Sequence, residues 1–309
     1  REGEKGEQRA FARFSEDEGR TWSTSRHLFD FPKQEGNYGT GYVNLVDKDG
    51  AIHLFGLHYI GTGPDGFYDW ENARTIGRRD LPFWVDLARR SKGPVLELGC
   101  GTGRVSLPVA KVCDRFVGVD RSMPMLQRLR SRLGRAGLHV RASAVRGDIR
   151  ALPFRKRFRF TLVMAPYGIL QSLLSDRDLR STLRSVAAVL PRGGFFAVDL
   201  VPDLPRWQEY KRRVSLQGRR SRGRHLTLIE TVRQDYDRHM TIFDQEYVER
   251  SGRRRESHRF SIAFRTLTVA QMSGQLERAG FHVHSVIGDY RGRAWSPDST
   301  VWVIVARRR

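Results

Sequence analysis

Apolar positions in the middle of the chain form short strand-like runs that alternate with helix-like stretches. Residues 95–98 are one such run, and a turn with three alternating glycines, Gly99, Gly101 and Gly103, follows it. Glycine lets the backbone turn sharply and approach a ligand closely, and a helix that begins directly after the turn points its free N–H groups at that ligand. The next apolar run ends at Asp120, where a carboxylate can accept both hydroxyl groups of a ribose. The pattern therefore predicts a nucleotide-type cofactor site.

The same alternation continues to the C-terminus. In residues 122–133 apolar side chains recur at the spacing of one helix face, and residues 268–279 also form a helix-like stretch, which ends at a glycine. Alternating strands and helices favour a parallel sheet that carries helices on both faces and binds its ligand across the carboxyl ends of the strands. The predicted fold is thus α/β, a Rossmann-like doubly wound sheet of seven strands. Its remaining strands are predicted at residues 117–120, 140–146, 160–165, 195–200, 281–287 and 300–305.

Between about residues 206 and 265 the pattern changes to longer strand-like runs. Three runs, 226–236, 240–249 and 257–264, are separated by short turns. Successive strands joined by short turns pair antiparallel. We therefore expect an antiparallel insertion of three strands within the α/β domain.

The first 62 residues do not share this pattern. Residues 42–46 and 51–55 flank an Asp-Lys-Asp-Gly turn, which is a hairpin signal. Residues 15–22 match S-x-D-x-G-x-T-W and resemble the Asp box, or BNR repeat, of sialidase-like propellers. Because a propeller closes only with about four to eight blades, this resemblance implies a β-rich fragment without glycosidase activity. We predict a β-rich segment at 1–62, a linker at 63–66 and one large domain at 67–309.

The register of the glycines distinguishes two classes of cofactor. A dinucleotide fingerprint, G-x-G-x-x-G, requires a third glycine where this chain has Arg104, so NAD is disfavoured. The residues instead match E-x-G-x-G-x-G, beginning at Glu97, which resembles motif I of the class I S-adenosylmethionine-dependent methyltransferases. The resemblance covers about residues 67–309. Residues 80–84, 102–105 and 165–173 look like the small-molecule branch of that family, which includes glycine and sugar-amine N-methyltransferases.

The resemblance implies S-adenosyl-L-methionine as the cofactor and S-adenosyl-L-homocysteine as the product. It places the methionine end of the cofactor over the glycine turn, which Glu97 orders, and the ribose on Asp120. It places the adenine between Met125 and Ile149, with the adenine amino group on Asp148. The predicted cofactor-binding residues are therefore Glu97, Gly99, Gly101, Gly103, Asp120, Met125, Asp148, Ile149 and Pro166.

The sulfonium cofactor already carries an activated methyl group, so such an enzyme mainly orients a nucleophile and excludes water. An amine acceptor can lose its proton to solvent, whereas a hydroxyl group requires a base more strongly. The candidate catalytic residues are Tyr167, Asp199 and Tyr68, and an ordinary structural role is the alternative for each. In the related N-methyltransferases the insertion forms a lid or a subunit contact, which implies a possible homodimer.

The charge of the chain raises an alternative acceptor. The chain has 55 Lys and Arg against 34 Asp and Glu, which gives a net charge of +21. Residues 1–66 carry a net charge of −3, and residues 67–309 carry +24. Arginine runs at 128–132, 219–224 and 253–255 could follow nucleic-acid phosphates, so RNA methylation is an alternative function. Against it, residues 165–167 read Ala-Pro-Tyr and lack the acid or amide that enzymes methylating base amines place before Pro-Pro-aromatic. We favour a small-molecule acceptor, and a non-catalytic fusion or binding module is a further alternative.

The cysteines and the apolar runs argue against disulfide-stabilised, metal-binding and membrane-spanning classes of protein. The two cysteines, Cys100 and Cys113, provide neither a disulfide framework nor the spacing of a metal site. No apolar run approaches the roughly 20 residues that a membrane-spanning helix needs. We therefore expect a cytoplasmic protein with no bound metal and no membrane partner.

Overall fold

A computed structural model describes residues 9–12, 26–30, 43–48, 51–56, 67–75, 78–155, 159–200, 209–219, 223–299 and 301–309. The chain separates into two compact units, Arg1–Thr40 and Gly41–Arg309. In the first, strand β1 (Arg9–Ala12) pairs antiparallel with β2 (Arg26–Asp30). The Asp-box match at 15–22 and the predicted linker at 63–66 lie outside the described residues, so both stay predictions.

The predicted hairpin near residue 50 is present in the second unit. Strand β3 (Val43–Lys48) pairs antiparallel with β4 (Ala51–Gly56), and Lys48 lies opposite Ala51. The two residues between these partners are Asp49 and Gly50. An Asp-Gly pair between two apolar runs is a sequence signal of a hairpin, which explains why the sequence identified this one.

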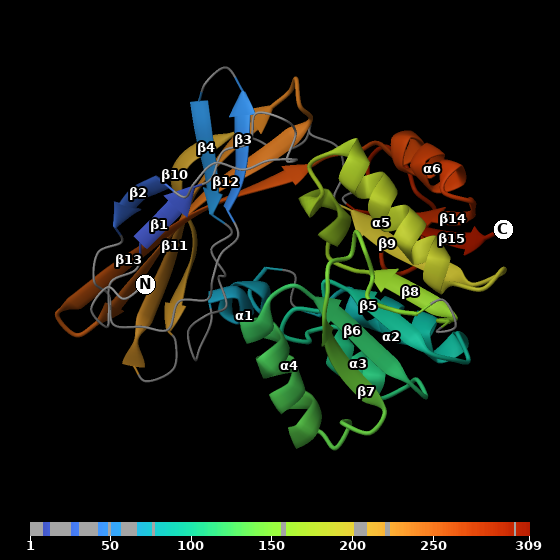
Figure 1. Cartoon of the computed structure of the whole chain (residues 1–309). Helices are drawn as coiled ribbons and strands as arrows, with labels where there is room; N and C mark the ends of the chain where they lie inside the picture. The colour runs from blue at the N-terminus through green and yellow to red at the C-terminus, as the bar shows by residue number, and fades with distance from the viewer. Residues whose placement is uncertain are drawn as a thin grey trace. The chain divides into compact units, whose positions relative to one another are not determined.

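A seven-stranded sheet forms the centre of the large unit, in the order β14-β15-β9-β8-β5-β6-β7 (Figure 1). Strands β5 to β9 pair in parallel, whereas β15 runs antiparallel to both β9 and β14. The predicted Rossmann-like doubly wound fold is confirmed. The strands are β5 (Val95–Leu98), β6 (Phe116–Asp120), β7 (Ala142–Arg146), β8 (Leu162–Ala165), β9 (Phe195–Leu200), β14 (Phe281–Ile287) and β15 (Trp302–Arg308).

Helices cover both faces of this sheet. The buried side chains of α5 (Asp176–Val189) and α6 (Val269–Arg278) join one hydrophobic cluster with one face of the strands. Those of α2 (Leu81–Arg90), α3 (Ser106–Ala110) and α4 (Met123–Arg135) join a second cluster with the other face. Because both faces are covered, the central strands are apolar at nearly every position.

Several predicted boundaries shift in the structure. The side chain of Val140 is 88% exposed, so β7 begins two residues later than its apolar residues suggested. The last strand, β15, extends to Arg308 rather than ending at Val305. Helix α3 begins at Ser106, whereas the sequence predicts its start at Arg104, directly after the glycine turn. Among the described residues no helix is long and apolar enough to cross a membrane.

The insertion forms a separate sheet of four antiparallel strands rather than the predicted three. The missed strand is β10, in which four of the ten residues are basic and most side chains are exposed at the sheet edge, so its few apolar residues did not show a strand pattern. The other strands agree with the predicted runs, apart from longer ends. The four strands are β10 (Tyr210–Arg219), β11 (His225–Asp235), β12 (Met240–Ser251) and β13 (Arg254–Arg265).

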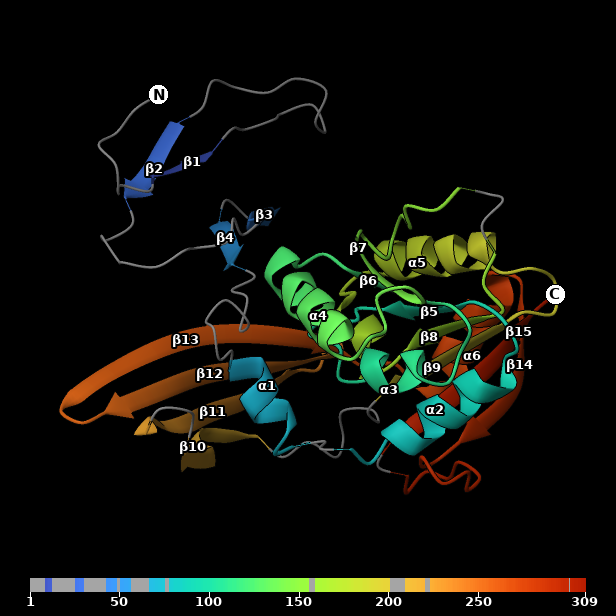
Figure 2. The ribbon, with the colours of Figure 1, turned by 90° about the horizontal axis from the view of Figure 1, so that it is seen from below.

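A short helix, α1 (Phe67–Asn72), packs on one face of the insertion sheet (Figure 2). Phe67 stacks on the ring of Tyr247 with ring centroids 4.8 Å apart, and Trp70 joins the same small apolar cluster as Leu226 and Leu228. Helix α1 also contacts the glycine turn of the main sheet, as described below.

Candidate functional site

The glycine turn after β5 requires its glycines. Gly99, Gly101 and Gly103 have φ angles of +65°, +51° and +93°, values that side chains with a Cβ atom rarely adopt. A Cβ atom at Gly99 would lie 2.5 Å from the side chain of Ile169, and one at Gly103 would lie 2.5 Å from Leu129. The turn therefore presents bare backbone at the carboxyl edge of the sheet, where parallel sheets bind ligands.

Asp120, at the end of β6, fixes this turn from the side. One carboxylate oxygen accepts a hydrogen bond from the Gly101 amide at 2.9 Å, and the other accepts one from the Ser122 amide at 2.8 Å. Burial nevertheless raises the pKa of Asp120 above its ordinary value. The strand-end acid thus already organises the loop, and its remaining lone pairs are what a ribose would use.

Glu97 lies behind the turn and is almost fully buried, with 2% of its surface exposed. It accepts a hydrogen bond from the Ser106 hydroxyl at 2.7 Å, which links β5 to the first turn of α3. Desolvation raises the pKa of Glu97 to about 8 despite this bond and the nearby Arg104 charge. The position agrees with a role in ordering the loop.

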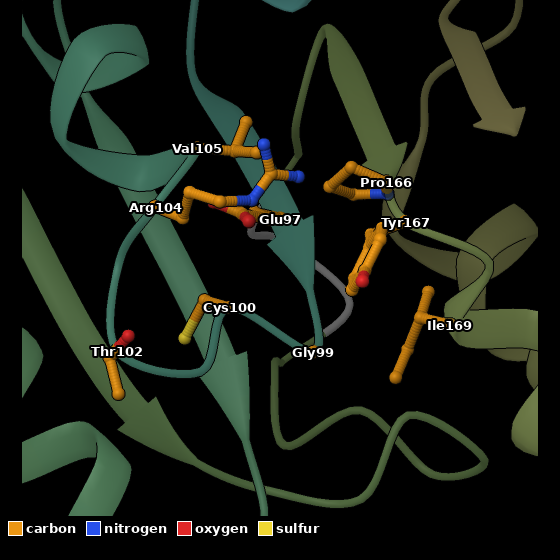
Figure 3. Close-up of a pocket in the computed structure, with 9 residues that line it drawn as sticks. All are labelled: Glu97, Gly99, Cys100, Thr102, Arg104, Val105, Pro166, Tyr167 and Ile169. Carbon is orange, nitrogen blue, oxygen red and sulfur yellow. The ribbon is translucent and has the colours of Figure 1, made fainter. Parts of the chain in front are cut away.

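A pocket opens between the glycine turn and the turn that follows β8 (Figure 3). Four predicted site residues line it, namely Glu97, Gly99, Pro166 and Tyr167. The remaining lining residues, which the sequence did not single out as site residues, are Cys100, Thr102, Arg104, Val105 and Ile169. Gly101, Gly103, Asp120, Met125, Asp148, Ile149 and Asp199 are outside this lining set.

Arg104 is the main residue of the pocket that sequence reasoning did not assign to it. Its guanidinium forms two hydrogen bonds, of 2.6 and 2.7 Å, with the carboxylate of Asp80, which is completely buried at the start of α2. The same guanidinium lies 5.2 Å from the ring centroid of Tyr167. A bidentate arginine–carboxylate pair is rigid, so Arg104 is held in place between the loop and Tyr167. The separation of 24 positions between Asp80 and Arg104 hides this pairing in the sequence.

The predicted adenine contacts lie beyond the lining set. Asp148 accepts bonds from the backbone amide and the guanidinium of Arg150, which together hold the pKa of its carboxyl group below the ordinary value. The guanidinium of Arg150 also forms an ion pair with the carboxylate of Asp178, with a nitrogen–oxygen distance of 3.0 Å. Ile149 is buried, and Met125 is partly exposed at the start of α4. The roles of these three residues in adenine binding stay predictions.

The three candidate bases have different surroundings. Tyr167 has a φ angle of +61°, is 40% exposed and has its pKa raised by burial. Asp199 is 1% exposed, and its two oxygens accept hydrogen bonds from the Gly168 amide at 2.9 Å and the Tyr290 hydroxyl at 2.6 Å. Burial raises the pKa of Asp199 to about 6. Tyr68 lies on α1, but its side chain is outside the described part of the structure.

Helix α1 is tied to the glycine turn through Asp69. One oxygen of Asp69 accepts the Thr102 hydroxyl at 2.5 Å, and the other accepts Arg132 at 2.8 Å. Arg132 also donates to the Thr102 carbonyl at 2.8 Å, and Arg128 lies 3.5 Å from Asp69. Two arginines of the run at 128–132 therefore pair with an acidic residue of the same chain. The network links α1 and α4 to the glycine turn.

Comparison with known proteins agrees with this geometry. Residues 95–194 match the family model of a methyltransferase domain. This segment contains β5 to β8, the glycine turn and Asp120, so it coincides with the candidate site. Residues 95–194 are therefore similar to a methyltransferase domain, and the prediction of a methyltransferase enzyme is confirmed.

Similar proteins cover most of the chain. The cypemycin N-terminal methyltransferase of a Streptomyces species is 27% identical over 245 residues, which are 78% of this chain and 94% of that protein. An S-adenosylmethionine-dependent methyltransferase from Clostridium acetobutylicum superposes with a TM-score of 0.66 at 14% identity, covering 78% of this chain and 97% of that one. The amino pentose methyltransferase CalS10 from Micromonospora echinaspora was solved with S-adenosylmethionine bound. It superposes with a TM-score of 0.60 at 19% identity, covering 79% of this chain and 98% of that one. These structures confirm the fold.

Proposed function

We propose that the protein transfers the methyl group of S-adenosylmethionine to an amine or hydroxyl group of a small molecule or peptide. The observation that carries this proposal is the glycine turn, whose positive φ angles and bond to Asp120 create a backbone cradle within the matched methyltransferase domain. A Cβ atom at Gly99 or Gly103 would collide with neighbouring side chains, so the chain is built to keep this cradle bare.

The residues present fit the cofactor. Asp120 would hold the ribose hydroxyl groups while it fixes the Gly101 amide, and Glu97 would keep the loop in register with α3. Arg104, held by the buried Asp80, lines the pocket wall, where its guanidinium would face the carboxylate at the methionine end of the cofactor. Met125, Ile149 and Asp148 would enclose the adenine, and Pro166 lines the pocket together with Tyr167.

When bound, the cofactor would supply an electrophilic methyl group, which would pass to the lone pair of the acceptor while sulfur keeps the electrons of the broken bond and the acceptor gives up one proton. The protein orients the acceptor in line with that bond and excludes water. Tyr167, at the pocket wall and held by the turn at Gly168, is positioned to contact the acceptor.

The similar proteins favour an amine acceptor. The cypemycin enzyme is named an N-terminal methyltransferase, and CalS10 is described as an amino pentose methyltransferase. RNA methylation is the alternative that the net charge of +21 suggests. It is weakened because Arg128 and Arg132 of one basic run already pair with Asp69.

Transfer of a tritiated methyl group from S-adenosylmethionine separates these acceptors. We expect the full chain to label members of a panel of amino sugars, small amines and peptides with free amino termini, and to leave bulk RNA unlabelled. Labelling of RNA that falls steeply with added salt, without labelling of the panel, would replace the small-molecule proposal by the RNA alternative. Binding of the cofactor without transfer to any acceptor class would favour a non-catalytic module.

A further inference from the structure

A group of acidic and amide side chains lies where helix α1 meets the insertion sheet. Glu71 on α1 accepts a hydrogen bond from the hydroxyl group of Tyr247 on β12. The amide nitrogen of Gln245, on the same strand, donates to Glu71 at 3.4 Å and to Glu230 on β11 at 3.0 Å. Glu230 and Gln245 are directly opposite each other in the sheet, so both side chains point to the face that α1 covers. We call these four residues the acidic cluster.

The two carboxylates of the acidic cluster lack the partners that other acids of the insertion have. Asp244, Glu246 and Glu249 each form an ion pair with at least one arginine. Within the part of the chain that the structure describes, neither Glu71 nor Glu230 forms one. Buried carboxylates without a counter-ion are costly, and this chain has an excess of arginine from which a partner could have come. The acidic cluster is therefore short of positive charge.

Gln245 gives an independent sign of a missing donor. The residue is 5% exposed, and its side-chain oxygen has no hydrogen-bond partner among the described residues. This oxygen shares a carbon atom with the amide nitrogen that binds Glu71 and Glu230, so it belongs to the same small volume. A buried acceptor without a donor is rare in folded proteins. The acidic cluster thus contains acceptor oxygens in excess of its N–H and O–H donors.

The acidic cluster adjoins the candidate cofactor pocket through Tyr167. Tyr167 lines that pocket, and its side chain interacts with Thr75 in the turn after α1 and with the charge of Glu71. Thr75 in turn donates from its hydroxyl group to the backbone carbonyl of Glu71 at 3.1 Å. Glu71 is only partly buried, so the acidic cluster is covered less completely on the side of α1 than on the side of the sheet.

We propose that Glu71, Glu230 and Gln245 form the subsite that binds the amino group of the methyl acceptor. An amino group brings two or three N–H donors and, when protonated, one positive charge, which are what the acidic cluster lacks. The neutral amine keeps its lone pair for the methyl carbon while its N–H groups are bound by the oxygens, and Glu71 receives the proton that the ammonium form releases. The subsite rests on the proposed methyl transfer and gives the insertion sheet a direct role in substrate choice.

Binding and transfer experiments on Glu230→Gln and Glu71→Gln test this subsite. The probes are glucosamine, benzylamine and tetra-alanine with a free amino terminus, each compared with its N-acetyl form, titrated into the full chain with S-adenosylhomocysteine present. We expect the wild-type protein to bind at least one free amine and to discriminate against its N-acetyl form. Each variant should weaken that binding, and kcat/KM for methyl transfer, by about tenfold or more, because a charged hydrogen bond is lost.

Two controls keep the outcomes separate. Glu246→Gln removes a carboxylate of the same strand whose partners are the largely exposed Arg212 and Arg259, so it should leave amine binding unchanged. Thermal unfolding of each variant shows whether the fold is retained, and titration of S-adenosylmethionine should give an affinity within about twofold of wild type.

Three results would overturn the subsite: equal binding of the free and acetylated forms, wild-type behaviour of both variants, or no amine binding by a protein that binds S-adenosylmethionine. None of these results would refute the proposed methyl transfer. Failure of the wild-type protein to bind S-adenosylmethionine would instead refute the proposed function, and the subsite with it.

Discussion

The buried carboxyl group of Glu97 makes the stability of the protein depend on pH. Its pKa in the folded state is about 8, against an ordinary value of 4.5, because burial disfavours the charged form. Between these two values the folded protein binds a proton that the unfolded chain releases. The free energy of unfolding should therefore fall as pH rises through this window, by up to about 1.4 kcal/mol per pH unit from this group.

Substitution of Glu97 by Gln removes the titrating carboxyl group and should make the free energy of unfolding depend less steeply on pH. Urea unfolding between about pH 5 and pH 8 measures it, and Glu277→Gln, an exposed position on α6, serves as the control with the wild-type slope. If Glu97→Gln and Glu277→Gln have equal slopes, Glu97 is ionised in the folded protein at neutral pH.

Asp199 was predicted as a candidate base, and its contacts favour a positioning role. Its oxygens hold the Gly168 amide and the Tyr290 hydroxyl, and so fix the turn that places Tyr167 at the pocket. Asp199→Ala leaves two buried donors without an acceptor and should lower the free energy of unfolding by about 2–4 kcal/mol. As a positioning residue, its loss lowers stability and methyl transfer together. An Asp199→Asn variant that abolishes methyl transfer while it keeps near wild-type stability would instead support Asp199 as the catalytic base.

At the scale of elements, the glycine turn packs closely against α4. Gly103→Ala would place a Cβ atom 2.5 Å from Leu129 at a φ of +93°, so we expect it to destabilise the protein by about 1–3 kcal/mol. The control is Gly134→Ala on the same helix, where no atom lies within 4 Å of the added Cβ atom. That change should stabilise α4 by about 0.5–1 kcal/mol. Equal effects of the two substitutions in urea unfolding would contradict the packing described here.

Elements with a regular apolar pattern were predictable from sequence, and those defined by distant partners were not. The alternation of strands and helices gave the parallel sheet, and the glycine register indicated the methyltransferase fold. The charged edge strand β10 has no apolar period and was missed. The pairing of Arg104 with Asp80, and of Glu71 with a residue 176 positions away, depends on chain paths that only the folded structure shows. Val140 was assigned to a strand because it is apolar, although it faces solvent.

For the whole molecule, the count of 55 Lys and Arg residues overstates the number of unpaired basic side chains. Many arginines of the described residues pair within the chain, among them Arg104 with Asp80, Arg132 with Asp69 and Arg150 with Asp148. Ion pairs of this kind do not change the net charge, but they leave fewer arginines to contact a phosphate backbone directly. We therefore expect tritium transfer to bulk RNA by the full chain to be no greater than by an Asp120→Ala variant. Salt-sensitive labelling above that level would show that RNA is a substrate.

The central claim is that the cradle of Gly99, Gly101 and Gly103, fixed by Asp120, binds S-adenosylmethionine. Isothermal titration of S-adenosylmethionine and S-adenosylhomocysteine into the full chain tests it most directly. We predict that both bind and that Asp120→Ala weakens both by about tenfold or more, because ribose contacts and the Gly101 bond are lost together. Asp114→Ala, an exposed acid near the same strand, should bind as wild type. No binding of either ligand to the folded wild-type protein would contradict the account.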